Sequence, residues 1–151
     1  MSEFINTIDV LGDDAVVDGI IQRTITEFKD NVVSKVGQYA FYGCASLTNV
    51  DLPAVTEIEN DAFNGCTILT VVVLRNESHV CNLSDTNAFA DTPIASGTGY
   101  AYVPRAWLSD DDETKDYRRA TNWSTYASQF RALEDYTVDG TITGELDETK
   151  I

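Results

Sequence analysis

Hydrophobic and polar positions in the middle of the chain follow one pattern that is written twice. The first copy, AFYGCASLTNVDLP, occupies residues 40–53, and the second, AFNGCTILTVVVLR, occupies residues 62–75. A shift of 22 residues superposes their alanine, phenylalanine, glycine, cysteine and leucine positions, and also places Val36 on Ile58. A fixed period in the twenties is typical of a solenoid, in which each repeat is one strand followed by a short helical or irregular return.

The positions that recur indicate which side chains face the interior of each coil. Phe41 and Phe63 are expected to fill the back of the coil, while Gly43 and Gly65 are expected where the backbone takes a conformation that side chains disfavour. Alternation of apolar and polar residues near the strand is the pattern of a strand with one buried face. The residues expected to point inward there are Leu47, Val50 and Leu52 in the first copy and Leu69, Val72 and Leu74 in the second.

Two clean copies predict further, diverged copies beside them, because one repeat cannot bury its own apolar side. Residues 25–36 are predicted to be a worn copy, with Ile25 and Phe28 supplying the strand contacts and a turn at residues 29–31. The expected fold class is therefore an α/β solenoid, a short stack of about three to four coils with a period of 22 residues.

Beyond the second copy, a polar insertion breaks the register. It covers residues 76–86 and is anchored by Val80 and Leu83. The pattern resumes at Ala88–Phe89, and Tyr100–Val103 is expected to form the strand of a third, diverged repeat.

The segments outside the repeats are expected to cover the open ends of the stack. The predicted organisation is an N-terminal arm or cap at residues 1–24, the solenoid at 25–104, a helical C-terminal cap at 105–136 and a polar acidic tail at 137–151. Asp13–Asp14 is a helix-start signal within the arm. In the tail, Asp139–Gly140 is a hairpin signal and Gly144 a second break.

The predicted C-terminal cap contains two helices. One is expected over residues 114–120, begun by the carboxylates of Ser109–Glu113, and the second from a turn at Asn122 to about Phe130. Trp123, Tyr126 and Phe130 are spaced three and four apart, a stripe that would lie over the last coil.

Charge narrows the classes of partner. The 151 residues carry 10 Lys and Arg against 25 Asp and Glu, a formal net charge of −15. Such a surface repels phosphate backbones and anionic membranes, so we expect no nucleic-acid partner. No apolar run is long enough for a transmembrane helix, so no membrane insertion is expected. The start of the chain lacks a basic region followed by an apolar one, so no signal peptide is expected.

The cysteines follow the repeat. Cys44 and Cys66 occupy the same repeat position, which places them about 5 Å apart in neighbouring coils. A buried ladder of small apolar side chains is favoured over a disulfide, which that spacing alone would not forbid. The repeat pattern places no second cysteine beside Cys81. All three are expected to be thiols.

Residues able to carry chemistry are few. His79 and Cys81 are close in sequence, but zinc needs two further ligands, so a solvent-facing loop histidine is favoured. The acidic run Ser109–Glu113 lacks the spaced ligands of a calcium loop, which favours helix capping over cation binding. We expect no catalytic residues, no bound cofactor and no metal site, and hence a protein that is not an enzyme.

Positions that the core does not need are the candidates for an interaction surface. Tyr42 points away from Phe41, and the tyrosines at 39, 42, 100 and 102 are all candidates for exposure, which suits recognition of proteins or glycans. The strand positions between the buried ones would line an open sheet face that is partly apolar, a pattern typical of a partner contact or self-contact. The candidate residues are Tyr42, Asn64, Asn49, Asp51, Val71, Val73, Tyr100 and Tyr102.

The two repeats resemble the BspA-type leucine-rich repeat, with its Ala-Phe, its Gly-Cys pair, and its Leu-Thr before a strand that ends near Pro. YVP at Tyr102–Pro104 and ATNWSTYASQ at Ala120–Gln129 resemble the segment that closes such repeats in gut bacterial and prophage proteins. The opening and the tail are similar to the ends of short repeat proteins carried by prophages of gut Firmicutes. The extra acidic residues around Ser109–Asp116 depart from the usual closing segment.

The resemblance implies interaction rather than chemistry, since BspA-type repeats are associated with adhesion and with binding of proteins or surface glycans. In a prophage setting the chain would be a virion protein, tail-associated or receptor-binding, made in the bacterial cytoplasm. Its partners would be other virion proteins or a host surface receptor, and a homo-oligomer is an open alternative. A second expectation is an adhesin that is secreted or displayed on the bacterial surface.

Overall fold

The computed structural model describes residues 7–8, 25–29, 34–135, 137–138 and 141–142. The predicted N-terminal arm therefore lies outside the described residues, apart from Thr7–Ile8. The helix-start signal at Asp13–Asp14 and the break at Gly144 also lie outside them.

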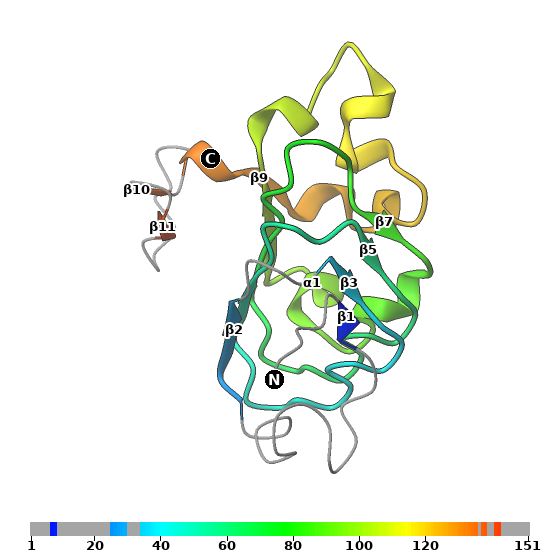
Figure 1. The fold of residues 1–151 in the computed structure, drawn as a ribbon, viewed down its shortest axis with the longest axis vertical. Coiled ribbons are helices and arrows are strands. Elements are labelled where there is room, and N and C mark those ends of the chain that lie inside the picture. Colours follow the sequence, from blue (N-terminus) through cyan, green and yellow to red (C-terminus); the bar gives the residue numbers. More distant parts are fainter. Residues whose placement is uncertain (1–6, 9–24, 30–33, 136, 139–140, 143–151) are drawn as a thin grey trace.

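Short strands form two parallel sheets between which the chain passes alternately (Figure 1). The first sheet has the order β1-β3-β5-β7, made of β1 (Thr7–Ile8), β3 (Lys35–Val36), β5 (Glu57–Ile58) and β7 (Asn82–Leu83). The second has the order β2-β4-β6-β8-β9, made of β2 (Glu27–Lys29), β4 (Asn49–Asp51), β6 (Val71–Val73), β8 (Tyr100–Val103) and β9 (Phe130–Ala132). Parallel pairing at each step is the arrangement expected of a coiling repeat.

Strand register follows the sequence period. Phe28 stands opposite Val50, and Val50 opposite Val72, each pair separated by 22 residues. The worn first copy thus keeps the same period as the clean copies. After the insertion, Val72 pairs with Ala101, which confirms the predicted strand at Tyr100–Val103.

Aromatic rings form a column through the core. Phe41 and Phe63 stack with centroids 5.1 Å apart, and Phe63 and Phe89 stack at 5.2 Å. Phe28 extends the column at one end, with its ring centroid 5.1 Å from that of Phe41. Trp123 extends it at the other end, 5.7 Å from Phe89. The phenylalanines predicted to fill the back of each coil therefore bind neighbouring coils together.

Left-handed backbone recurs at the glycine position of the repeat. Gly43 has φ 72° and Gly65 has φ 87°, which confirms the conformation predicted for them, and Asp91 takes the third place with φ 57°. A Cβ atom added at Gly65 would lie 3.3 Å from the Cα atom of Gly43. Glycine at this position therefore serves the turn and the close approach of adjacent coils.

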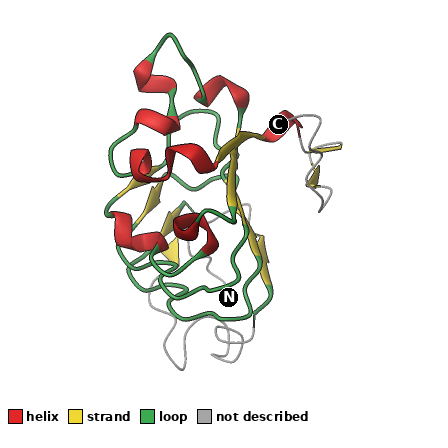
Figure 2. Cartoon of the chain, turned by 180° about the vertical axis from the view of Figure 1, so that it is seen from behind, coloured by secondary structure: helices red, strands yellow, loops and turns green. Residues whose placement is uncertain are grey.

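The helices are short, and Figure 2 shows them gathered mainly where the C-terminal half of the chain lies. They are η1 (Thr86–Phe89), α1 (Pro93–Ser96), η2 (Arg105–Trp107), η3 (Glu113–Lys115), η4 (Tyr117–Arg119), η5 (Trp123–Gln129) and η6 (Leu133–Asp135), of which all but α1 are 3₁₀ turns. None of the helices among the described residues is long and apolar enough to cross a membrane.

The predicted C-terminal helices are present only as 3₁₀ turns, and the second ends at Gln129, next to the expected end at about Phe130. Phe130 begins strand β9, which pairs with β8 and extends the sheet. The aromatic stripe does cover the neighbouring coil: Trp123 and Tyr126 both contact the ring of Phe89. Hydrogen bonds fix it, because the indole Nε1 of Trp123 donates to the carbonyl of Cys81 at 2.7 Å.

At the C-terminal end, β10 (Thr137–Val138) pairs with β11 (Thr141–Ile142) in an antiparallel ladder. Val138 stands opposite Thr141, so the two strands are joined by the two residues Asp139–Gly140. That pairing agrees with the predicted hairpin signal, although the joining residues themselves lie outside the described part of the chain.

Candidate interaction surface

The outer face of the five-stranded sheet presents two rows of side chains, fixed by strand register. One row is Glu27, Asn49, Val71 and Tyr100, and the other is Lys29, Asp51, Val73, Tyr102 and Arg131. The face is charged and polar on β2 and β4, and it becomes apolar and aromatic on β6 and β8. The two halves of the sheet therefore offer different surfaces.

The apolar half is covered by the chain itself. Val73 is 1% exposed and Tyr102 is 5% exposed, and both pack against Leu133 in one buried cluster. Val71 and Tyr100 are partly buried against the same cluster. The expectation that Val73 and Tyr102 lie on an open sheet face is therefore wrong, because residues after β9 fold back over them.

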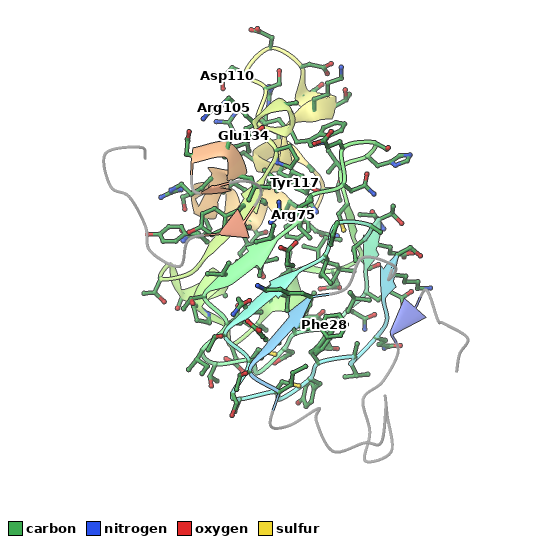
Figure 3. The ribbon with its side chains drawn as sticks, turned by 60° about the vertical axis from the view of Figure 1, so that its left-hand side comes forward. Phe28, Arg75, Arg105, Asp110, Tyr117 and Glu134 are labelled. Carbon is green, nitrogen blue, oxygen red and sulfur yellow. The ribbon has the colours of Figure 1, made fainter. Side chains whose placement is uncertain are left out.

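Polar contacts hold this covering segment in place. The carboxylate of Glu134 accepts a hydrogen bond from the backbone N–H of Arg105 at 2.8 Å, and Figure 3 shows these two residues near one another. The Arg105 guanidinium forms an ion pair with Asp135. The guanidinium of Arg131 lies over the ring of Tyr100, 4.5 Å from its centroid. Tyr100 is thus engaged within the chain on one side of its ring.

The polar half of the sheet remains accessible. Glu27 and Lys29 are exposed, while Asn49 and Asp51 are partly exposed. The Asp51 carboxylate accepts two hydrogen bonds from the Arg75 guanidinium, at 2.8 and 3.0 Å. Such a bidentate pair orients both groups, so this part of the surface is preorganised.

A second exposed surface lies on the turns that precede the repeated glycines. Tyr39 is 40% and Tyr42 is 47% exposed, and their rings meet edge to face at 5.5 Å. One repeat later, the equivalent residues are Asp61 and Asn64, and the Asn64 amide donates to the Asp61 carboxylate at 2.9 Å. The structure thus places the predicted Tyr42 and Asn64 on one surface, apart from the sheet residues.

Sequence reasoning missed Asp61 and Asn87 as members of that surface. The side-chain oxygen of Asn87 accepts a hydrogen bond from the backbone N–H of Asp61 at 3.1 Å, from one coil to the next. The signal that could have found Asp61 is its offset of 22 residues from Tyr39, since the equivalent turn position then changes from aromatic to acidic.

The cysteines are buried and form no disulfide. The Cys66 thiol donates to the carbonyl of Phe41 at 3.0 Å. A side-chain hydrogen bond with Cys44, and then burial, raise the pKa of the Cys66 thiol, while burial raises the pKa of Cys81. Cys66 and Cys81 are therefore protonated thiols and poor nucleophiles, and all three cysteines are free, as predicted.

His79 lies exposed in the insertion, as predicted. Its backbone N–H and that of Ser78 donate to the side-chain oxygen of Asn76, which closes a local turn. Within the part of the chain that the structure describes, no group of three or more His, Cys, Asp and Glu side chains could hold a metal ion.

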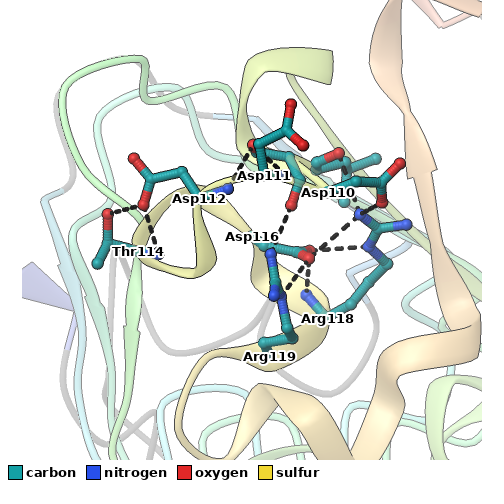
Figure 4. A network of polar contacts seen from close by, with 9 residues as sticks. Asp110, Asp111, Asp112, Thr114, Asp116, Arg118 and Arg119 are labelled. Carbon is teal, nitrogen blue, oxygen red and sulfur yellow. Dashed lines mark hydrogen bonds and ion pairs between the residues drawn. The ribbon is translucent and has the colours of Figure 1, made fainter.

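The acidic loop forms a compact polar network (Figure 4). Asp112 caps η3 by accepting a hydrogen bond from the backbone N–H of Thr114, which confirms the predicted capping role. Asp116 is only 3% exposed and accepts hydrogen bonds from the guanidinium groups of Arg118 and Arg119. Although burial opposes its charge, these bonds hold the pKa of Asp116 below its usual value. The loop is therefore ordered by its own arginines.

The repeat sequence matches a known family of proteins. Residues 12–99 match the family described as BspA type Leucine rich repeat region (6 copies). The match covers more than half of the 151 residues, so the chain belongs to the BspA-type leucine-rich-repeat family. The BspA-type repeat is a protein–protein interaction and adhesion repeat. Searches of the curated proteins and of the solved structures found no match to the chain.

Proposed function

We propose that this chain is a non-enzymatic binding and assembly module that acts through protein partners. The observation that carries the proposal is membership of an interaction-repeat family over residues 12–99. The repeated apolar residues fill the core, which leaves the outer turns and the polar sheet face for recognition.

The surface proposed to meet a protein partner is the polar half of the five-stranded sheet. It presents Glu27 and Lys29 on the first strand of that sheet and Asn49 and Asp51 on the next. Charges of both signs on a rigid sheet favour a specific, electrostatically matched partner.

Burial of the thiols supports a role without catalysis. Nucleophilic cysteine chemistry needs a thiolate that substrate can reach, whereas Cys44, Cys66 and Cys81 are buried and the pKa values of Cys66 and Cys81 are raised. We propose on this ground that the chain is not an enzyme.

Within this function, we propose a structural role in a phage or prophage virion, tail-associated or receptor-binding. In this view a stack of about three to four coils is closed at its ends by residues 1–24 and 105–136. Support comes from the likeness of the two ends of the chain to short prophage repeat proteins. An adhesin at the bacterial surface is the second candidate, favoured by the association of the repeat with adhesion.

The virion role is tested by mass spectrometry of purified particles from a lysogen that carries the gene, with light scattering of the purified chain beside it. A fixed stoichiometry in the particles is the expected result. Particles that lack the chain, together with a monomer in solution, would overturn the role.

The sheet surface is tested with a charge swap that conserves net charge. Glu27→Lys with Lys29→Glu is expected to weaken binding to the particle proteins at least tenfold. The matched control is Glu113→Lys with Lys115→Glu on η3, which exchanges the same charges at exposed positions elsewhere. Equal effects of the two swaps would exclude the sheet as the binding surface.

A further inference from the structure

We propose that Tyr39 and Tyr42, together with Asp61 and Asn64 of the next repeat, form a binding site for a neutral saccharide. This site lies on the turns rather than on the sheet, and its ligand class differs from the protein partner proposed above.

The first observation is a pair of accessible aromatic rings. Tyr39 and Tyr42 are two of the three large hydrophobic residues that are exposed among the described residues, the third being Ile68. Their edge-to-face contact at 5.5 Å fixes each ring relative to the other. An exposed tyrosine ring packs on the C–H face of a sugar ring, while its hydroxyl donates to or accepts from sugar hydroxyls.

The second observation is a pair of polar side chains beside the rings, at the equivalent turn positions of the next repeat. Asp61 and Asn64 occupy the same turn positions one repeat later, and one hydrogen bond joins their side chains. A carboxylate accepts up to about four hydrogen bonds and a primary amide both donates and accepts, so capacity remains for a pair of adjacent hydroxyls. Apolar rings together with a few polar groups that fix orientation are the usual composition of a small-molecule site.

Backbone hydrogen bonds hold the two pairs side by side. The N–H of Tyr39 donates to the carbonyl of Asn60 at 3.4 Å, and the N–H of Gly43 donates to the carbonyl of Asn64 at 2.8 Å. Between them, the N–H of Phe41 donates to the carbonyl of Ala62 at 2.7 Å. Each turn of the site is thus hydrogen-bonded to the turn of the next coil, so little conformational freedom is lost when a ligand binds.

The third observation is the backbone of Tyr39, which has φ 63°. Bulky residues rarely adopt this left-handed conformation, whereas Asn and Asp adopt it more readily. The fold does not require an aromatic residue here, since Asp61 has the equivalent conformation with φ 61°. A strained position that carries an exposed ring is typical of a site kept for recognition rather than stability.

Charge selects the class of saccharide. Asp61 lies within the site. Glu59 lies next to it, where its carboxylate accepts a hydrogen bond from the N–H of Gln38 at 3.2 Å and forms an ion pair with Lys35 at 3.1 Å, so the negative charge within the site is that of Asp61. The whole chain carries a formal charge of −15. Sialylated, sulfated and uronic acid-containing chains would be repelled, which leaves neutral oligosaccharides with adjacent hydroxyls as the ligand class.

The test uses the full chain on a panel of immobilised neutral oligosaccharides built from glucose, mannose, galactose and N-acetylhexosamine, with sialylated and sulfated chains for comparison. We expect binding to at least one neutral chain and none to the charged ones. Tyr42→Ala and Asp61→Ala are each expected to weaken that binding at least tenfold. Ile68→Ala removes an equally exposed apolar side chain outside the site and should leave binding unchanged.

Tyr39→Asn separates recognition from folding. This variant keeps a residue that tolerates the left-handed turn, so its melting temperature should equal or exceed that of the wild type, while saccharide binding falls. Absence of binding to every neutral chain at millimolar concentration would overturn the proposal. A dimer that Tyr42→Ala converts to monomer would also overturn it, since the tyrosines would then form a self-contact. The Glu27/Lys29 charge swap should not change saccharide binding, so failure of either proposal is distinguishable from failure of the other.

Discussion

The rings of Phe41 and Phe63 lie parallel, with an interplanar angle of 1° and centroids 5.1 Å apart, although 22 residues separate them. Phe89 stacks on the other side of Phe63 with an interplanar angle of 11°. Phe63 is therefore in contact with an aromatic ring on both faces. Because each ring belongs to a different repeat, the column couples the stability of neighbouring coils.

Phe63→Ala is expected to destabilise the protein by about 3–5 kcal/mol, since it removes a fully buried ring and leaves a cavity between two others. Urea unfolding followed by circular dichroism measures the change. Ile68→Ala, at a position 45% exposed, is the control and should change stability by less than about 0.5 kcal/mol. A loss below about 1 kcal/mol for Phe63→Ala would mean that the column can close over the gap.

Gly65→Ala tests the left-handed turn and the close contact between coils separately. At Gly97, φ is 96° and an added Cβ atom meets nothing within 4 Å, so Gly97→Ala costs only the left-handed conformation, about 1–2 kcal/mol. Gly65→Ala carries the same cost and also brings its Cβ atom to 3.3 Å from the Cα atom of Gly43. Thermal unfolding should therefore show a larger loss of stability for Gly65→Ala than for Gly97→Ala. Equal losses would contradict the close approach of the two turns.

Asp116 is expected to make the free energy of unfolding depend on pH in the acid range. Its pKa is lowered from the usual 3.8, so the stabilisation it contributes is present above that value and is lost as the pH falls toward the lowered pKa. Asp116→Asn should cost about 1.5–3 kcal/mol at neutral pH, the range for hydrogen bonds to charged groups. The difference in free energy of unfolding between Asp116→Asn and the wild type should decrease below about pH 4.

Asp110→Asn is the matched control for this experiment. Asp110 also pairs with Arg118, but its side chain is 88% exposed, so little effect is expected at any pH. A constant difference between Asp116→Asn and the wild type across the acid range would show that Asp116 is not the titrating group.

The buried thiols are expected to resist alkylation. Because burial and hydrogen bonding raise the pKa of Cys66, and burial raises that of Cys81, neither is a thiolate at pH 8 in the folded chain. Iodoacetamide followed by mass spectrometry should give no adduct on the native protein and one adduct per cysteine after unfolding in urea. Rapid labelling of the native chain would place at least one thiol in contact with solvent.

The core was predictable because a solenoid repeats its own environment. Val50 and Val72 pair across neighbouring strands, and Gly43 and Gly65 share one turn conformation, as a shift of 22 residues indicated. Ala88–Phe89 was also recognised, because the insertion lies in a loop and does not alter the contacts that the repeat makes with its neighbour.

The candidate surface was only partly predictable. Tyr42 was correctly expected to be exposed, and strand alternation correctly directed Val73 and Tyr102 away from the core formed by Val50 and its equivalents. Alternation specifies the face of a sheet, however, and not what lies on that face. The helical spacing predicted beyond Asn122 concealed the strand at Phe130–Ala132, since a strand of three residues that follows directly on a 3₁₀ segment is too short to give a clear period.

By itself, the sequence determined the repeat, its 22-residue period, the inward residues and the glycine turns, because these depend on contacts between neighbouring copies at a constant separation. Only the tertiary structure decided that Leu133 covers Val73 and Tyr102, and that Tyr39 and Tyr42 lie beside Asp61 and Asn64. Leu133 reaches Val73 across 60 residues of chain. Such contacts follow from where the C-terminal segment folds back, which no local period encodes.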